Sequence, residues 1–143
     1  MQYKKVFTGL ICPYCGKKTE FVDSSVIYGK SYGMIYLCKQ CDAYVGVHKG
    51  TAKSLGRLAN KELREAKKKA HYYFDKIAKT GLIHKIYPVS IPGISSRKKA
   101  YLWLSKQMKI PKEDCHIGMM DIKQCNQVAN ISINAIIKYN QKP

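Results

Sequence analysis

The chain has 143 residues, 45% of them hydrophobic, which suits one ordinary core or a small metal-stabilised module beside a helical one. Its 26 Lys and Arg against 9 Asp and Glu give a formal charge of +17, which favours polyanions, chiefly nucleic acid or an anionic membrane surface, and we favour nucleic acid. Periodic apolar clusters exclude a disordered chain, and the absence of a long apolar run leads us to expect no membrane partner.

The first residues, MQYKKVFTGLIC, place basic side chains before a short apolar run. That run is shorter than the core of a signal peptide and leads directly into a CPYC sequence, so we interpret it as part of the fold. Without an export signal we expect a cytoplasmic location. In that reducing compartment, six cysteines serve better as metal ligands than as disulfides.

Two β-prone runs follow, FVDSSVIY at 21–28 and MIYLC at 34–38, and they predict a hairpin. The connection between them has glycine at both ends, Gly29 and Gly33, where a turn needs positive backbone angles. Together with the surrounding cysteines, this pattern predicts a zinc ribbon over residues 1–55.

Four cysteines form two Cys-x2-Cys pairs separated by twenty-two residues. They are Cys12, Cys15, Cys38 and Cys41. A two-residue gap lets both thiolates of a pair reach one metal, and Gly16 permits a turn that points backbone amides at the sulfurs. The second pair has Asp42 in the place of that glycine, and aspartate tolerates the left-handed conformation.

An iron–sulfur cluster or a redox-active pair would use the same residue type. Two matched pairs around a hairpin favour closed tetrahedral zinc instead. Because four thiolates leave no open position for water or substrate, we predict one structural Zn²⁺. The bound ion lowers the effective charge to about +15, since four thiolates and one divalent cation together contribute a net negative charge.

From residue 56 onward the composition changes to helix formers, and most of the charge lies in this part. We predict a basic helical region over residues 56–143, packed with the zinc ribbon as one compact unit. The expected fold class is therefore α+β, with about three helices beside the ribbon.

The first helix is predicted from Arg57 or Asn60 to Lys79, with Asn60 as N-cap and Gly81 as a stop. Apolar residues three and four apart define its buried face: Ala59, Leu63, Ala66, Ala70, Tyr73, Phe74 and Ile77. The opposite face, here called the basic face, carries Lys61, Arg64, Lys68, Tyr72, Lys76 and Lys79.

The basic face predicts nucleic-acid binding, with DNA and RNA both open. Phosphate contacts are expected from Lys61, Arg64, Lys67, Lys68 and Lys76. Tyr72 among these cations is suited to stack on a base or a sugar. The alternative is a face that is merely solvated, which is common for a helix of this composition.

The segment at 81–96 is punctuated by Pro and Gly but apolar enough to pack, and we expect an ordered crossing, with a short strand as one option. A second helix is predicted over 97–109, ended by Pro111. Its predicted buried stripe is Ala100, Trp103, Leu104 and Met108. The lysines predicted to lie outside that stripe are Lys98, Lys99 and Lys106.

A third helix is predicted after Asp121, because DIKQ has the spacing of a capping box. Five of its residues share one face: Cys125, Ala129, Ser132, Ile136 and Tyr139. Cys115, His116 and Cys125 could supply three ligands of another zinc. Since Cys125 lies on the apolar face and free cysteine behaves as a small hydrophobe, we favour core packing.

Several motifs in a fixed order resemble a family of bacterial and bacteriophage zinc-finger-containing proteins, and the resemblance spans nearly the whole chain. They are CPYCG, IYGKSYG, CKQCDAYVGVHKGT, SLGRLANKELREAKKKAHYYFDKI, RKKAYLWLSKQM and CHIGMMDIKQCNQV. The resemblance implies a four-cysteine zinc finger and a phage-related origin, and it implies no particular activity.

A second hypothesis is an enzyme, a metal-assisted nuclease or hydrolase. Its candidate catalytic residues are His48, His71, Asp75 and His116. His71 and Asp75 are four residues apart on one helix, so convergence with the other histidines would create a second metal site or an acid–base pair. We favour the simpler interpretation of a surface His–Asp hydrogen bond and a capping or core histidine, which leaves no catalytic residue firmly assigned.

No P-loop, Rossmann, Ser-His-Asp or HExxH pattern occurs, so the sequence leans away from those enzyme classes. A third hypothesis is a phage-encoded interaction module whose basic surface binds an acidic host protein. The three hypotheses share the same structural zinc.

Overall fold

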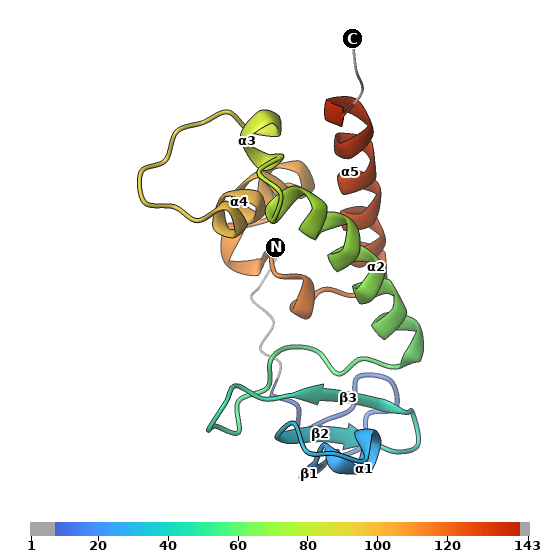
Figure 1. The fold of residues 1–143 in the computed structure, drawn as a ribbon. Coiled ribbons are helices and arrows are strands. Elements are labelled where there is room, and N and C mark those ends of the chain that lie inside the picture. Colours follow the sequence, from blue (N-terminus) through green and yellow to red (C-terminus); the bar gives the residue numbers. More distant parts are fainter. Residues whose placement is uncertain (1–7, 141–143) are drawn as a thin grey trace. The chain divides into compact units, whose positions relative to one another are not determined.

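The computed structural model describes residues 8–140, and residues 1–7 and 141–143 lie outside what it describes (Figure 1). The chain forms two compact units that divide between Arg64 and Glu65. The first contains a three-stranded antiparallel sheet and the second contains the long helices. This arrangement confirms the α+β class.

The sheet of the first unit has the strand order β1-β2-β3, with both neighbouring pairs antiparallel. The strands are β1 (Glu20–Asp23), β2 (Met34–Cys38) and β3 (Ala43–Gly46). The predicted hairpin is confirmed for β1 and β2, where Phe21 pairs with Tyr36. Strand β3 was not predicted, because four residues after a metal-binding turn are too few to show a period of two.

The predicted strand at 21–28 is wrong in its second half, which forms the one-turn helix α1 (Ser25–Tyr28). The cause is local: a carboxylate oxygen of Asp23 accepts the N–H of the first helical residue at 2.8 Å and turns the chain out of the ladder. Gly29 and Gly33, with φ of +71° and +108°, take the predicted positive angles.

The core of this first unit is small. Ile35, Leu37, Ala59 and Leu63 are buried in it. A cluster around the predicted ligands consists of Cys12, Tyr36, Cys38, Ala43 and Leu58, with partly buried Cys15, Cys41, Val45 and Val47 around it. Four of these nine side chains are the predicted metal ligands. A core of this size gives too little apolar burial for independent stability, so a bound metal is expected to supply much of the folding free energy.

Helix α2 (Lys61–Ala78) contains the boundary between the units and matches the first predicted helix to within a residue at its end. Asn60 caps it as predicted, since the Leu63 N–H donates to Asn60 Oδ1 at 2.9 Å. Gly81, with φ of +80°, follows its end. The predicted buried face is confirmed, with its centre at Leu63, Ala70, Phe74 and Ile77.

A short helix, α3 (Ile83–Ile86), forms part of the predicted crossing, and no strand occurs there among the described residues. Leu82, Ile83 and Ile86 are all buried. Their spacing of one and three residues is that of a helix face, which is why this apolar segment folds as a helix and not as a strand.

The remaining elements of the second unit follow in sequence order. They are α4 (Ser96–Met108), the 3-10 turns η1 (Lys112–Asp114) and η2 (Ile117–Met119), and α5 (Ile122–Asn140). The capping box at the start of α5 is confirmed, since the Gln124 N–H donates to Asp121 Oδ1 at 2.8 Å and the Asp121 N–H donates to Gln124 Oε1 at 3.1 Å.

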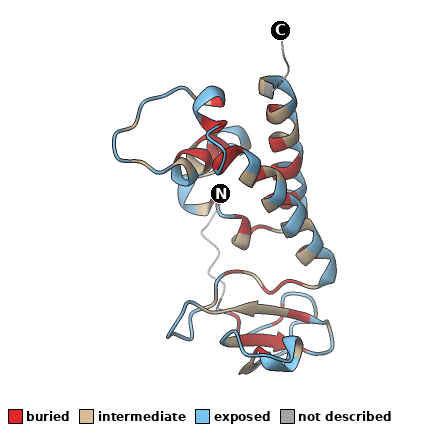
Figure 2. Cartoon of the chain, viewed as in Figure 1, coloured by how far each residue is buried: buried red, intermediate tan, exposed pale blue. Residues whose placement is uncertain are grey.

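The core of the second unit is built from buried residues of α2, α3, α4, α5 and the turn η2. Figure 2 shows buried positions along the long helices. Its largest fully buried side chains are Phe74, Ile77, Ile83, Leu104, Ile117, Met120 and Val128. None of the described helices is long and apolar enough to cross a membrane.

The predicted exposure of Lys99 is wrong, because only 5% of this residue is accessible. Its aliphatic stem packs within the unit and its Nζ contacts His84 Nδ1 at 3.1 Å. A lysine stem can cover apolar surface in this way while its nitrogen keeps a polar partner.

Candidate functional site

The first cysteine pair lies in a tight turn closed by backbone hydrogen bonds. The Cys12 N–H donates to Lys17 O at 2.8 Å, and the Gly16 N–H donates to Cys12 O at the same distance. Gly16 has a φ of +77°, as its predicted role requires. The Tyr14 N–H points at Cys12 Sγ, 3.4 Å away, so a backbone dipole faces a sulfur that becomes negative when it binds a metal.

The second pair lies at the end of β2, where Cys38 is the last strand residue and Cys41 stands in the turn to β3. Asp42 takes a positive φ of +51°, so the expected left-handed conformation at this position is confirmed. Its N–H donates to Lys39 O at 3.2 Å and closes the turn. The two turns therefore use the same conformation with different residues.

The four sulfurs meet, with all ligand atoms within 4.8 Å of one another. The Sγ atoms of Cys15 and Cys38 are 3.7 Å apart. Sulfurs bound to one zinc at about 2.3 Å occupy the corners of a tetrahedron whose edges are about 3.8 Å. The cysteines thus fit one zinc ion, and four protein ligands complete its coordination, which makes the site structural.

The pKa values of these thiols determine how protons compete with a metal ion for the sulfurs. Burial, together with hydrogen bonds among the thiols, raises the pKa of Cys41 to about 12, and burial also raises the pKa of Cys12. A backbone hydrogen bond from Lys17 lowers the pKa of Cys15. A bound divalent cation deprotonates coordinating thiols, so zinc competes with protons and its affinity falls as the pH falls.

Tyr14, inside the first cysteine pair, is a structural residue that sequence patterns did not reveal. Its hydroxyl donates to Leu58 O at 3.1 Å and accepts the Asn60 N–H at 3.3 Å. These bonds join the metal-binding turn to the residues just before α2. A tyrosine at this position has no periodic or spacing signal, so only the tertiary structure identifies its role.

Arg64, one of the predicted phosphate contacts, has partners within the first unit. Its guanidinium donates to Asp42 O at 2.7 Å, to Asp42 Oδ2 at 3.0 Å and to Ala59 O at 2.8 Å. It also lies 4.5 Å from the centre of the Tyr44 ring. Because these contacts occupy the guanidinium, we leave Arg64 out of the interface proposed below.

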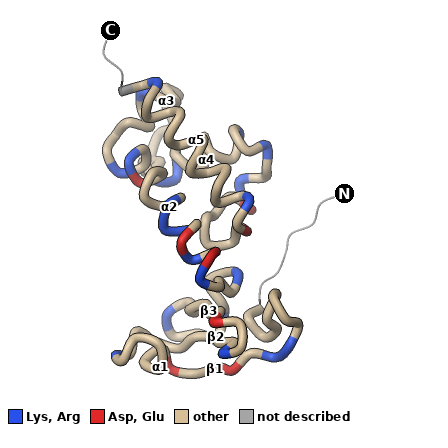
Figure 3. The backbone as a smooth tube through the Cα atoms, turned by 90° about the vertical axis from the view of Figure 1, so that its right-hand side faces the viewer, with Lys and Arg blue, Asp and Glu red and all other residues tan. Residues whose placement is uncertain are grey.

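Lys67 has a partner as well, since its Nζ donates to Gly118 O at 3.1 Å. Five residues of α2 that belong to the second unit are exposed: Glu65, Lys68, Lys69, Tyr72 and Lys76. Figure 3 shows basic and acidic positions along α2. Tyr72 is 59% exposed, and Lys76 Nζ lies 4.7 Å from the centre of its ring. Lys61, in the first turn of α2, is also exposed.

The predicted histidine candidates each have separate surroundings. His71 Nδ1 is 3.0 Å from Lys67 O, and the ring of His116 packs 5.4 Å from that of Tyr101. Asp75 pairs with Lys79 at 3.4 Å and with Arg97 at 3.9 Å. The structure therefore gives the carboxylate cationic partners in place of the hydrogen bond to His71 that we favoured.

His48 is exposed in the first unit, where its backbone N–H donates to Lys53 O at 2.9 Å. Within residues 8–140, the only group of three or more metal-ligating side chains close enough to share an ion is the four cysteines. Cys115 and Cys125 are completely buried in the second unit. The catalytic assignment of His48, His71, Asp75 and His116 stays a prediction with no supporting arrangement.

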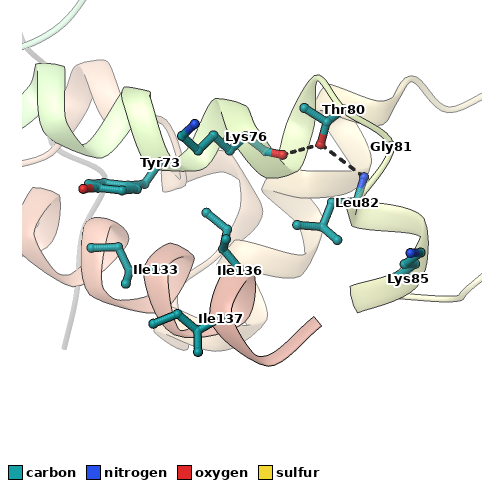
Figure 4. A pocket seen from close by; sticks show the side chains of 9 residues that line it. All are labelled: Tyr73, Lys76, Thr80, Gly81, Leu82, Lys85, Ile133, Ile136 and Ile137. Carbon is teal, nitrogen blue, oxygen red and sulfur yellow. Dashed lines mark hydrogen bonds between the residues drawn. The ribbon is translucent and has the colours of Figure 1, made fainter. Parts of the chain in front are cut away.

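A groove of about 630 Å³ lies between α2, α3 and α5 (Figure 4). Tyr73, Leu82 and three isoleucines of α5 supply most of its lining. The hydroxyl of Thr80 at its edge is already bonded to the backbone of Lys76. The groove offers apolar contact and two lysine side chains, and its lining contains no carboxylate, histidine or thiol for acid–base chemistry.

Comparison with known proteins gives a family. The model of a zinc-finger-containing domain matches residues 8–135, which includes all four ligands and the greater part of α5. A search of curated proteins and a search of solved structures each found no match. The family match covers most of the chain and agrees with the four-sulfur geometry, so this chain belongs to the family of zinc-finger-containing domains.

Proposed function

We propose that the chain binds nucleic acid, DNA or RNA, through the exposed cations of α2, with the zinc serving only to stabilise the fold. The formal charge of +17 supports this proposal, because it attracts polyanions over long range. Zinc-bound thiolates reduce that charge only to about +15. A cytoplasmic location, as expected from the sequence, would give access to both kinds of nucleic acid.

The observation that carries the proposal is the alignment of Lys68, Tyr72 and Lys76. These residues are four apart, so they lie along one side of the helix, and all three are exposed. Neither lysine has an acidic partner among the described residues, which leaves both nitrogens available to phosphates. Phosphate contacts of this kind bind with little sequence preference and weaken as salt rises.

Reversing two of these charges is expected to weaken binding about tenfold or more at low salt. In the variant Lys68→Glu/Lys76→Glu, two phosphate contacts are lost, and the slope of log K against log salt for duplex DNA should decrease by about 1.8. Fluorescence anisotropy with a labelled duplex and a labelled single strand, at several salt concentrations, measures both quantities.

The matched control is Lys98→Glu/Lys106→Glu on α4, where two exposed lysines are reversed with the same change in net charge. The control should lose much less affinity, because it changes the long-range field without touching the proposed contacts. If the unaltered chain binds neither probe at low salt, or if both double variants lose affinity equally, the proposal fails.

A further inference from the structure

The first unit carries exposed tyrosines that the zinc site and the basic face do not use. Tyr32 is 71% exposed and Tyr28 is 52% exposed, both in the segment that connects β1 and β2. Clustered apolar surface that is exposed commonly marks a binding site. Three tyrosines form the cluster, since Tyr44 of β3 lies beside Tyr28.

The three rings contact one another edge to face. The centres of Tyr28 and Tyr32 are 5.5 Å apart with an angle of 89° between the planes, and those of Tyr28 and Tyr44 are 6.1 Å apart at the same angle. Edge-to-face contact leaves part of each ring face uncovered. Tyr44 is the exception, because the guanidinium of Arg64 lies 4.5 Å from its centre. The exposed rings of the cluster are therefore those of Tyr28 and Tyr32.

The backbone that carries these tyrosines is held in place by hydrogen bonds of Ser24 and Asp23. Ser24 is 2% exposed; its Oγ accepts the Tyr32 N–H at 2.7 Å and its N–H donates to Gly33 O at 2.8 Å. Asp23 accepts from the Ser31 hydroxyl at 2.8 Å. A connection fixed in this way loses little conformational entropy when a ligand binds to its side chains.

A cation accompanies the open rings. Lys30 Nζ lies 5.8 Å from the centre of the Tyr32 ring, and no carboxylate pairs with this lysine among the described residues. Aromatic rings next to an unpaired cation suit a ligand that has both a flat π-surface and a negative charge. A nucleotide in a single strand has both, because its base can leave the stack while its phosphate stays beside it.

We propose that Tyr28 and Tyr32 stack on unpaired bases while Lys30 contacts the adjoining phosphate, so that the nucleic acid this chain prefers is single-stranded. This inference rests on the proposed function and specifies its ligand as single-stranded nucleic acid. In a duplex the bases are already stacked on one another and are not free to cover the rings. The tyrosine cluster therefore adds affinity for single strands alone.

The test uses the full zinc-loaded chain with two labelled probes of about 12 nucleotides, oligothymidine and a duplex of the same length. The variant Tyr28→Ala/Tyr32→Ala is expected to lose about tenfold or more in affinity for oligothymidine, since each stacked base contributes about 1–3 kcal/mol. Duplex affinity should stay unchanged. Tyr28→Phe/Tyr32→Phe is the matched control, because phenylalanine keeps the ring and should keep the affinity.

Zinc content and amide protection of β2 establish that each variant is folded. Should the double variant fail this check, Tyr32→Ala alone serves, because a side chain so exposed contributes little to the fold. Unchanged oligothymidine affinity in the alanine variant, an equal loss on the duplex, or an equal loss in the phenylalanine variant overturns the inference. If binding still depends on Lys68 and Lys76 in those cases, the proposed function stands; if the unaltered chain binds neither probe, both fall.

Discussion

Replacing Cys38 by serine is expected to abolish tight zinc binding and to unfold the first unit. Cys38 is 6% exposed, belongs to the small core and places one of four sulfurs around the ion. Zinc binding to such sites supplies on the order of 10 kcal/mol of folding free energy, far more than this core can replace. Hydrogen exchange should show loss of amide protection in β1, β2 and β3.

The second unit should survive the same substitution. It has its own core, and the single tryptophan of the chain, Trp103, lies within it. The fluorescence of Trp103 should therefore remain that of the folded chain while the sheet loses protection. If the sheet loses protection while the helices stay folded, the zinc stabilises the first unit and not the second.

Cys115→Ser is the matched control for the loss of a thiol. Cys115 is completely buried in the second unit, and among the described residues it belongs to no group of three or more metal-ligating side chains. The substitution should destabilise the helices by burying a hydroxyl, yet leave the zinc in place. A Cys38→Ser chain that keeps its zinc and its β2 protection would contradict the assignment of the ligands.

Gly9→Ala is expected to destabilise the first unit by about 2–5 kcal/mol. Gly9 has a φ of +83°, and an added Cβ would stand 2.4 Å, 2.6 Å and 2.9 Å from three ring carbons of Tyr36. Tyr36 belongs to the core of the unit and cannot move without disturbing the strand that carries Cys38. Hydrogen exchange of β2 amides, at a fixed free zinc concentration, measures the change.

Gly50→Ala separates the two causes of that loss. Gly50 has a similar φ of +76°, but nothing lies within 4 Å of an added Cβ. Gly50→Ala should lower the free energy of unfolding of the first unit by about 1–2 kcal/mol, through backbone strain alone. If the two alanine variants were equally stable, the contact between Gly9 and the Tyr36 ring would have no energetic role.

Features with a local cause could be predicted from the sequence. The capping box of Asp121 and Gln124 depends on residues three apart, and the structure has both of its hydrogen bonds. The Cys-x2-Cys turns depend on spacing and on one residue that accepts a positive φ, a role that Gly16 and Asp42 fill. In each case the interacting groups are neighbours in the chain, so composition and spacing are sufficient.

Features that depend on distant partners could not be predicted. Arg64 has the helical position of a phosphate ligand, but residue 42 of the sheet turn binds its guanidinium. The sequence predicts Lys99 as a surface lysine, but in the fold its nitrogen contacts His84, which lies fifteen residues earlier in the chain. The tyrosine pair was missed for a different reason: residues 25–28 were predicted as a strand, whereas helix α1 and the turn after it bring Tyr28 and Tyr32 together.

The zinc content of the purified chain tests the central claim most directly. Elemental analysis should find one zinc ion per chain in the unaltered protein and in His71→Ala, and none in Cys38→Ser, because the four cysteines are the only such group among the described residues. A second equivalent that disappears in His71→Ala would contradict a purely structural zinc. The absence of zinc from the unaltered chain after expression with adequate zinc would contradict the metal site itself.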